Sequence, residues 1–429
     1  MSASNRRIYP AVVSGRVRAP PSKSYTHRAL IAGFLTSRVH RVYRPLDADD
    51  TRATANGITQ LGARISRKNP ARWTLTPEPL RRPRRPRTIR CRESGTTLRF
   101  LCAVGALGEG TLRFEGSPSL ARRPMDELWE ALRSLGAEVT PARRGRSLPF
   151  LVRGPLHAGS LKIFGGTSSQ FVSALLLTLP VLDGDSEVQL TGSVVSRPYL
   201  DATISVLKSH GIRYRRRPRG YELPGSQIYR AREFRVPGDA SSAAYLWTAA
   251  ALTEGSIRVD GLDFDRPQAD AAILPILEKA GADVTMDSDG ATVSGGTLRP
   301  FTADLSDSPD LYPLLGTLAA FIPGKSRLLG APHVVFKESN RREGTMRLAS
   351  AFGARVTSSN GGLAILGHSH PSGISFEGLD DHRLVMSAAV GALAANSPSI
   401  LGDARCVRKS FPEFWNALRS IGARTERAS

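Results

Sequence analysis

The chain has few cysteines and no long apolar run, and both absences narrow the class of protein. Its three cysteines, Cys91, Cys102 and Cys406, are widely spaced, which predicts neither a disulfide framework nor a metal site. No apolar run is long enough to cross a bilayer, and the opening MSASNRRIYP lacks the apolar core of a signal peptide. We therefore expect a cytoplasmic protein that does not bind membranes.

Lysine and acidic residues are scarce relative to arginine. The 429 residues include 59 Lys and Arg against 38 Asp and Glu, a net charge of +21, and only eight of the cations are lysines. This surplus fits a nucleic-acid surface or a cleft for small anions inside a basic coat, and composition leaves both open. Some of the few lysines are expected where a compact, proton-exchanging ammonium is needed. The length favours two domains.

The sequence repeats a unit of about 72 residues six times. In most copies a helix-like segment ends in an apolar residue and glycine, and a strand-like stretch follows, as in LGAEV at 135–139. The glycine predicts a left-handed helix end. These glycines are Gly62, Gly136, Gly211, Gly281, Gly353 and Gly422. Such a period indicates one supersecondary unit used repeatedly.

A second helix recurs between these segments and is apolar all round. Examples are SKSYTHRALIAGFL at 22–35 and SGTTLRFLCAVGAL at 94–107. A helix without a polar face must be buried, so we expect these helices at the centre of each three-unit domain, with strands at 111–116, 186–192 and 256–261. Each should begin with Ser, Thr, Asp or Gly, and the free N–H groups there attract anions. For any single copy, helix capping alone is a sufficient explanation.

Capping does not explain the charged groups that gather at equivalent points of the repeat. Lys23 and Arg28 flank Ser24, and Glu93 and Arg99 bracket a glycine in the next copy. Further loops between the helices carry ARRPMDE, SRPYLD, FKESNRR and RKSFPEF. A solvated surface would scatter such groups, so their recurrence favours a binding site.

These stretches resemble the 5-enolpyruvylshikimate-3-phosphate synthases, a family of enolpyruvyl transferases. The matching motifs, in chain order, are PPSKSYTHRAL, SGTTLR, RRPM, SSQF, SRPYLD, GDASSAAY, PD, FKESNR, DHR and KSFPEF. The resemblance implies an α/β (α+β) fold, an inside-out α/β barrel, with two domains of three βαβαββ units around buried central helices. It places residues 20–234 in one domain and residues 1–19 with 235–429 in the other, with the active site in the interdomain cleft.

The implied reaction transfers the enolpyruvyl group of phosphoenolpyruvate to the 5-hydroxyl of 3-phosphoshikimate and releases phosphate, in the shikimate pathway of aromatic amino-acid biosynthesis. No metal or organic cofactor is implied, because phosphoenolpyruvate carries its own leaving group. Both substrates are phosphorylated carboxylates, so cations must offset their repulsion. Gly95 stands where the family leaves room for the inhibitor glyphosate. We expect a monomer that does not bind nucleic acid.

The resemblance also carries over site residues. The predicted 3-phosphoshikimate contacts are Lys23, Ser24, Arg28, Ser168, Ser169, Gln170, Ser196, Asp310, His333 and Lys337. The predicted phosphoenolpyruvate contacts are Lys23, Gly95, Arg123, Gln170, Arg341, Arg383 and Lys409. Asp310 is the predicted general base at the 5-hydroxyl, and Lys23 and Glu338 are candidate proton donors to the enol carbon. The resulting tetrahedral adduct then eliminates phosphate.

Three positions depart from the common family pattern. Glu93 and His333 stand where many relatives have asparagine, and Asn340 stands where aspartate is common. These changes leave the reaction class intact. Whether Glu93 and His333 contact substrate stays open.

Three other functions compete with this interpretation. A transferase acting on UDP-N-acetylglucosamine is disfavoured, because EGSPSLARRP at 115–124 lacks the reactive cysteine of that family and Ser24 follows the motif lysine. A nucleic-acid-binding protein is supported by the charge and by RRPRRPR at 81–87, but this run lacks interleaved aromatics. A binding protein without turnover would require that the proton-handling residues be dispensable.

Overall fold

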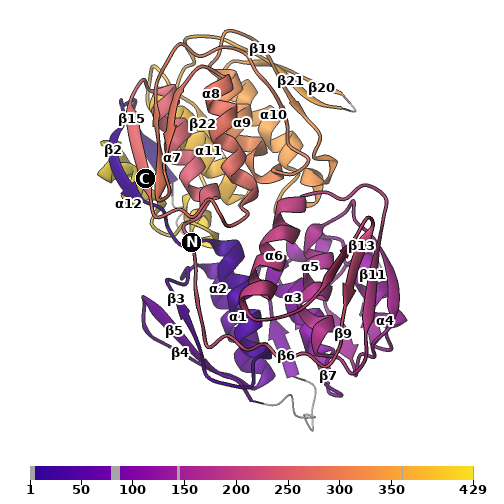
Figure 1. The fold of residues 1–429 in the computed structure, drawn as a ribbon. Coiled ribbons are helices and arrows are strands. Elements are labelled where there is room, and N and C mark those ends of the chain that lie inside the picture. The colour runs from indigo at the N-terminus through magenta and orange to yellow at the C-terminus, as the bar shows by residue number, and fades with distance from the viewer. Residues whose placement is uncertain (1–4, 79–86, 143–144, 360, 429) are drawn as a thin grey trace. The chain divides into compact units, whose positions relative to one another are not determined.

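The computed structural model of the chain describes residues 5–78, 87–142, 145–359 and 361–428 (Figure 1). The chain divides into two compact units, Pro21–Pro237, called here the central unit, and Met1–Pro20 with Gly238–Ser429, called the terminal unit. Residues 81–86 of the arginine-rich run RRPRRPR lie outside the described residues. Within the described ranges, no helix combines the length and apolarity needed to cross a membrane.

The described strands of the central unit form three four-stranded sheets, each with one parallel and two antiparallel pairings. In spatial order, the first sheet contains β14 (Glu233–Arg235), β3 (His40–Tyr43), β5 (Arg72–Thr76) and β4 (Arg64–Asn69). The second contains β6 (Arg87–Arg90), β7 (Thr111–Glu115), β9 (Phe150–Arg153) and β8 (Glu138–Pro141). The third contains β10 (Ser160–Phe164), β11 (Ser186–Thr191), β13 (Gly220–Leu223) and β12 (Arg215–Arg217).

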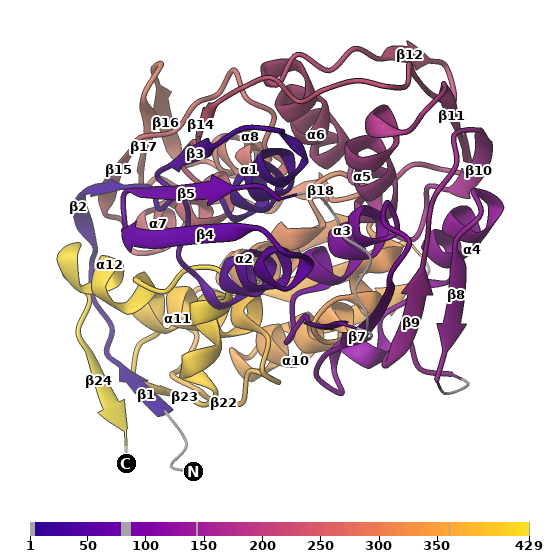
Figure 2. The ribbon, with the colours of Figure 1, turned by 90° about the horizontal axis from the view of Figure 1, so that it is seen from below.

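The terminal unit repeats this arrangement. Its sheets are β16 (Asp283–Met286), β17 (Gly290–Ser294), β15 (Ser256–Asp260) and β2 (Ser14–Arg18); β18 (Thr302–Asp304), β19 (Gly324–Leu329), β21 (Gly362–Gly367) and β20 (Arg355–Ser359); and β22 (Ser375–Phe376), β23 (Ser399–Leu401), β1 (Asn5–Ile8) and β24 (Thr425–Ala428). Figure 2 shows β1 and β24, from the two ends of the chain, side by side. The strands predicted from TLRFEG, SEVQLTG and SIRVDG are confirmed as β7, β11 and β15.

The chain passes between the two units twice, and at each passage the first strand of a repeat joins a sheet of the unit that the chain is leaving. β2 precedes helix α1 (Lys23–Leu35) in the chain, yet it pairs in parallel with β15 of the terminal unit. β14 precedes helix α7 (Ala240–Leu252), yet it pairs in parallel with β3 of the central unit. Each unit thus completes one sheet with a strand from a distant part of the sequence.

Two kinds of helix alternate along the chain, as the sequence predicts. The buried helices are α1 (Lys23–Leu35), α3 (Gly95–Gly105), α5 (Ser169–Thr178), α7 (Ala240–Leu252), α9 (Tyr312–Ala320) and α11 (His382–Ala394). The amphipathic helices are α2 (Asp49–Leu61), α4 (Asp126–Ser134), α6 (Arg197–Ser209), α8 (Ile273–Lys279), α10 (Arg341–Ala351) and α12 (Phe414–Ser420). Short 3₁₀ segments are η1 (Leu120–Arg122), η2 (Leu179–Val181), η3 (Ala269–Ala272), η4 (Pro309–Leu311), η5 (Pro332–Phe336) and η6 (Ala404–Lys409).

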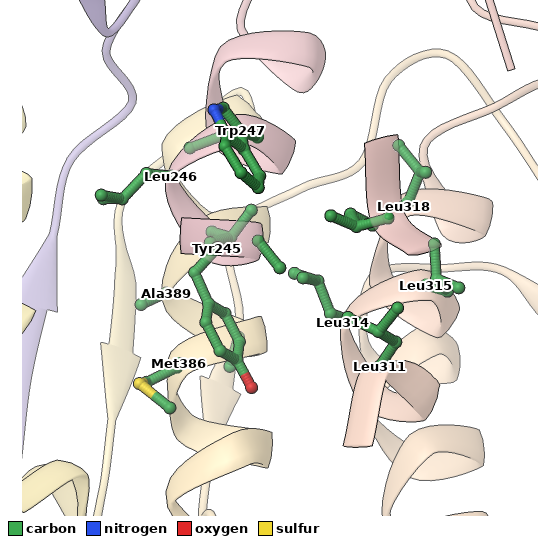
Figure 3. Close-up of a cluster of buried hydrophobic side chains, with 14 of the residues drawn as sticks. Tyr245, Leu246, Trp247, Leu311, Leu314, Leu315, Leu318, Met386 and Ala389 are labelled. Carbon is green, nitrogen blue, oxygen red and sulfur yellow. The ribbon is translucent and has the colours of Figure 1, made fainter. Parts of the chain in front are cut away.

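The buried helices form the core of each unit. Figure 3 shows this for the terminal unit, where Tyr245 and Trp247 of α7, Leu314 of α9 and Met386 of α11 meet in one cluster. Each of these side chains is at most 1% exposed. Burying one large apolar side chain contributes about 1.5–3 kcal/mol, so this packing fixes the helix ends from which polar groups project.

The six predicted helix-ending glycines all adopt positive φ, between 74° and 122°, which confirms the left-handed ends. Five buried helices begin behind a side-chain cap, and these caps are Ser22, Ser94, Ser168, Asp239 and Asp381. The prediction of a polar cap is wrong for α9, which begins behind Leu311. There the chain enters through η4, and the carboxylate of Asp310 in η4 pairs with cations instead.

A buried histidine makes the stability of the central unit depend on pH. His210 is 0% exposed, its Nδ1 lies 2.7 Å from the carbonyl oxygen of Val206, and its buried Nε2 has no partner among the described residues. Burial lowers the pKa of His210 to about 4. The unfolded chain, with an ordinary pKa of about 6.5, therefore binds more protons between these values, and acid favours unfolding.

We expect the free energy of unfolding to fall as the pH drops from about 6.5 to about 4, with His210 contributing at most about 1.4 kcal/mol per pH unit. A His210→Gln variant should lose less stability than the parent between pH 7 and 4.5, measured by urea denaturation. His157→Gln is the control, because His157 is exposed. An unchanged pH dependence in His210→Gln would assign the acid sensitivity to other groups.

Candidate active site

In the terminal unit, four predicted residues converge on the carboxylate of a fifth, Asp310, or on its immediate partner. Asp310 Oδ1 accepts a hydrogen bond of 2.6 Å from Arg341 Nη1 and lies 3.4 Å from Lys337 Nζ. Asp310 Oδ2 accepts one of 2.8 Å from Arg383 Nη2. Glu338 joins the group through Arg341, 2.6 Å away. These residues lie at or just before the N-terminal ends of α9, α10 and α11, so the repeated helix starts bring them together.

Arg341 lies at the centre of this cluster. Its side chain is 1% exposed, and besides Asp310 and Glu338 its Nε donates to Asp381 Oδ2 at 2.9 Å. Burial alone would lower the pKa of Arg341, but these three carboxylates raise it. Asp381 also caps α11 by accepting from the Arg383 backbone at 2.9 Å. One guanidinium thereby fixes the start of α11 relative to Asp310.

Opposing effects act on two aspartates of the cluster, the partly buried Asp310 and the fully buried Asp270. Burial raises the pKa of Asp310, but Arg383, Lys337 and Arg341 outweigh it and hold this pKa well below its usual range. Burial raises the pKa of Asp270 to about 6, although Arg383 Nη1 lies 3.7 Å from its Oδ2. At neutral pH Asp310 is ionised and is able to accept a proton. The three cations stabilise the carboxylate and therefore oppose its protonation.

His333 and Lys409 are the other predicted residues of this unit. His333 in η5 is 4% exposed, and burial together with the charge of Lys337 lowers its pKa to about 3. It therefore presents a neutral imidazole. Lys409 Nζ donates to the carbonyl oxygen of Asp380 at 2.6 Å, next to the capping residue Asp381. His333 thus lies close to Lys337 of the Asp310 cluster, and Lys409 lies close to Asp381, which bonds to Arg341.

Asn340 also belongs to this region and explains one departure from the family pattern. It caps α10 by accepting a hydrogen bond of 3.2 Å from the backbone N–H of Glu343. Asparagine serves this purpose about as well as aspartate. The change therefore preserves the helix start that carries Arg341.

In the central unit, predicted groups gather at the starts of α3 and α5. A Cβ added to Gly95 would lie 3.0 Å from Arg123 Nη1 and 3.4 Å from Arg99 Nη1, so both guanidinium groups face this glycine. Arg99 Nη1 donates to Gln170 Oε1 at 2.7 Å, and Ser168 caps α5. Ser169 is the first residue of that helix. Two helix starts and two arginines thus form an anion-attracting surface.

A second group lies at the start of α1. Lys23 Nζ forms an ion pair of 3.2 Å with Asp50 of α2. Arg28 is 2% exposed and donates to Ser24 O at 2.9 Å and to Thr203 Oγ1 at 2.8 Å. Burial lowers the pKa of Arg28 to about 10, so it stays charged at neutral pH. This cation is bonded to neutral oxygens, which leaves its charge available to a nearby anion.

Ser196 lies at the start of α6, a helix that Arg28 also contacts. It precedes α6 with a left-handed φ of 55° and is 4% exposed. Arg28 Nη2 donates to the carbonyl oxygen of Tyr199 at 2.9 Å, in the first turn of α6. Arg28 therefore joins the start of α1, which carries Ser24, to the start of α6.

The predicted substrate contacts do not include several residues that position them, although Arg99 stands out in the sequence as a charge beside Gly95. Asp50 orients Lys23, Asp381 and Asp270 accompany the arginines of the terminal unit, and Arg99 orients Gln170. The acidic pair at 49–50, in so basic a chain, was a usable signal for the first of these.

Metal-ligand clusters and exposed thiols are not found in the described part of the chain. No group of three or more His, Cys, Asp or Glu side chains gathers there as metal ligands. Cys91, Cys102 and Cys406 are free and buried, and burial raises the pKa of each thiol.

Comparisons with known proteins agree with one another. A model of the EPSP synthase family (3-phosphoshikimate 1-carboxyvinyltransferase) matches residues 9–418. Proteins named 3-phosphoshikimate 1-carboxyvinyltransferase from Methanocorpusculum labreanum and Halobacterium salinarum are 39% and 38% identical to this chain. The first match covers 96% of this chain and 97% of the relative, and the second covers 98% and 99%.

Solved structures share the fold at lower sequence identity. EPSP synthase from Acinetobacter baumannii superposes with a TM-score of 0.83 at 22% identity, over 99% of this chain and all of the other. The enolpyruvyl transferase NikO from Streptomyces tendae superposes with a TM-score of 0.81 at 17% identity, over 100% and 99% of the two chains.

Proposed function

Because the chain belongs to the EPSP synthase family, we propose that it transfers the enolpyruvyl group of phosphoenolpyruvate to the 5-hydroxyl of 3-phosphoshikimate and releases phosphate. This reaction belongs to the shikimate pathway of aromatic amino-acid biosynthesis. The observation that carries the proposal is the Asp310 cluster, in which a carboxylate suited to proton abstraction is held by Arg341, Arg383 and Lys337.

The two substrates use residues from both units. Phosphoenolpyruvate takes Lys23, Gly95, Arg123 and Gln170 from the central unit and Arg341, Arg383 and Lys409 from the terminal unit. 3-Phosphoshikimate takes Lys23, Ser24, Arg28, Ser168, Ser169, Gln170 and Ser196 from the central unit and Asp310, His333 and Lys337 from the terminal unit. Two observations support these assignments. The predicted residues of the central unit gather at the starts of α1, α3 and α5, and those of the terminal unit gather around Asp310, in a chain that belongs to the family.

Phosphoenolpyruvate binding would prepare Asp310 to act as the base. In the described structure Asp310 itself accepts hydrogen bonds from Arg341 and Arg383. A substrate carboxylate on these arginines offsets their charge, and the pKa of Asp310 then rises toward a value at which the carboxylate takes a proton from a hydroxyl. The base is thus activated when phosphoenolpyruvate is bound.

Lys23 is favoured over Glu338 as the donor of the proton to the enol carbon. Glu338 accepts a charge-assisted hydrogen bond of 2.6 Å from Arg341, which favours its ionised form. Lys23, paired with Asp50 at 3.2 Å, carries an ammonium proton. After the C–O bond to the shikimate oxygen forms, the tetrahedral adduct loses phosphate, and the proton gained by the methyl carbon is returned.

The test is a phosphate-release assay with the purified chain. Phosphate should appear only when phosphoenolpyruvate and 3-phosphoshikimate are both present, and in equal amount to the enolpyruvyl product. Release from either compound alone, at the same rate, would indicate a phosphatase and reject the transferase.

Glyphosate should inhibit the reaction, and Gly95→Ala should relieve that inhibition. The new methyl group would lie 3.0 Å from Arg123 Nη1 and reduce the space for an anion at this arginine. We expect inhibition to weaken tenfold or more, about 1.4 kcal/mol of binding free energy. Gly159→Ala is the control, because a Cβ there has an ordinary contact of 3.6 Å with Leu135. Equal inhibition of Gly95→Ala and the parent would contradict the assignment.

A further inference from the structure

The third repeat of the central unit contains a basic pocket that the proposed reaction does not use. It has a volume of about 210 Å³ and is lined by residues of α6, β11, β12 and β13 and of the loops that join them. Eleven described residues line it, and neither aspartate nor glutamate is among them. Four of them are arginines, namely Arg197, Arg216, Arg217 and Arg219.

The charges of Arg216 and Arg219 are weakly offset. Arg217 forms an ion pair with Glu222, but Arg216 Nη1 lies 3.4 Å from Asp201 Oδ1, a long exposed contact of little energetic value. The guanidinium of Arg219 forms no ion pair within the described residues, although its backbone carbonyl accepts a hydrogen bond from Leu190 in the β11 wall. The pocket therefore keeps a positive charge.

A buried tyrosine supplies a neutral donor beside these cations. Tyr221 lines the pocket, is 3% exposed, and makes no hydrogen bond through its hydroxyl within the described part of the chain. Burial raises the pKa of Tyr221, the charges of Arg216 and Arg197 lower it, and the charge of Asp201 adds to the rise. Leu200 and Val194 add apolar walls.

The pocket is separate from the candidate active site. Arg197 and Leu200 line it, whereas Tyr199 and Thr203 of the same helix bond to Arg28 through their oxygen atoms. At 100° per residue these two pairs lie on different faces of α6. A group bound in the pocket therefore does not occupy the position of a ligand of Arg28.

We propose that this pocket binds a phosphate dianion, either free or as a small phosphomonoester. Arginine forks and a phenol hydroxyl match the oxygens of phosphate, and arginine binds phosphate in bidentate geometry. The volume of about 210 Å³ lies below the usual range for drug-sized ligands, about 300–1,000 Å³, so the carbon part of an ester must be short. The proposal does not depend on the proposed reaction.

Protection of individual arginines from phenylglyoxal tests this proposal in solution. The full chain is modified with and without inorganic phosphate or ribose 5-phosphate, at ionic strength matched with sodium chloride, and peptides are quantified by mass spectrometry. Modification of Arg216 and Arg219 should slow about tenfold at ten times the dissociation constant. Arg64 and Arg67 of β4 serve as internal controls, because they are exposed and lie on the corresponding hairpin of another repeat.

A matched variant distinguishes specific binding in the pocket from nonspecific attraction of anions to a basic surface. Arg216 is exposed, so Arg216→Gln should leave the fold intact and yet remove most of the protection of Arg219. Equal protection by both compounds identifies free phosphate as sufficient, and stronger protection by the ester identifies a phosphomonoester site. Protection that sodium chloride reproduces, that extends equally to Arg64 and Arg67, or that survives Arg216→Gln would overturn the proposal.

Discussion

Replacing Asp310 with asparagine is expected to lower the turnover number by a factor on the order of one hundred or more, while 3-phosphoshikimate still binds. The amide keeps the shape of the side chain but cannot accept the proton of the 5-hydroxyl. It also removes the charge that Arg341, Arg383 and Lys337 now share. Single-turnover kinetics and calorimetric titration with 3-phosphoshikimate measure the two effects separately.

Asp307→Asn is the matched control for this variant. Asp307 is exposed and lies three residues before Asp310 on the same loop, so the same substitution there should leave turnover within about twofold, since surface changes usually have small effects. Unchanged turnover in Asp310→Asn would remove Asp310 from the mechanism. Equal losses in both variants would assign the effect to the loop rather than to the base.

Arg341→Met is expected to destabilise the terminal unit by about 3–5 kcal/mol. Arg341 is 1% exposed and bonds to Asp310, Glu338 and Asp381, so the variant leaves three carboxylates close together without the cation between them. Arg341→Lys should lose less stability, because the charge remains although the bidentate geometry is lost. Urea denaturation at pH 7 measures both variants.

The control for this series is Arg347→Met, in the same helix. Arg347 is exposed, and its substitution should change the free energy of unfolding by no more than about 0.5 kcal/mol. If Arg341→Met were as stable as Arg347→Met, the ion cluster would not hold α10 and α11 in place. Activity of Arg341→Met has to be measured where the variant is still folded.

Much of the fold could be predicted because its helices and strands follow from local sequence periodicity. The all-round apolar helices, the glycine ends and the strands between them depend on residues close together in the sequence. The exchange of β2 and β14 between units could not be predicted in this way, because a period of about 72 residues does not say which sheet a first strand joins.

Some residues of the candidate site could also be predicted from the sequence, whereas their interaction partners could not. Lys23, Arg341 and Arg383 stand out as charges beside helix starts, but their partners lie far along the chain. Asp50 is 27 residues from Lys23, and Asp381 is 40 residues from Arg341. The absence of a polar cap at α9 could not be predicted for the same reason. Asp310 pairs with cations that come close to it only in the folded unit. Partner choice of this kind requires the tertiary structure.

The central claim is that phosphate leaves by cleavage of the C–O bond of phosphoenolpyruvate after the shikimate hydroxyl has added to its carbon. The most direct measurement runs the reaction in ¹⁸O-labelled water and analyses both products by mass spectrometry. Vinyl transfer predicts phosphate without solvent oxygen, formed only together with the enolpyruvyl product. Phosphate that carries one solvent oxygen, released without that product, would show hydrolysis and contradict the account.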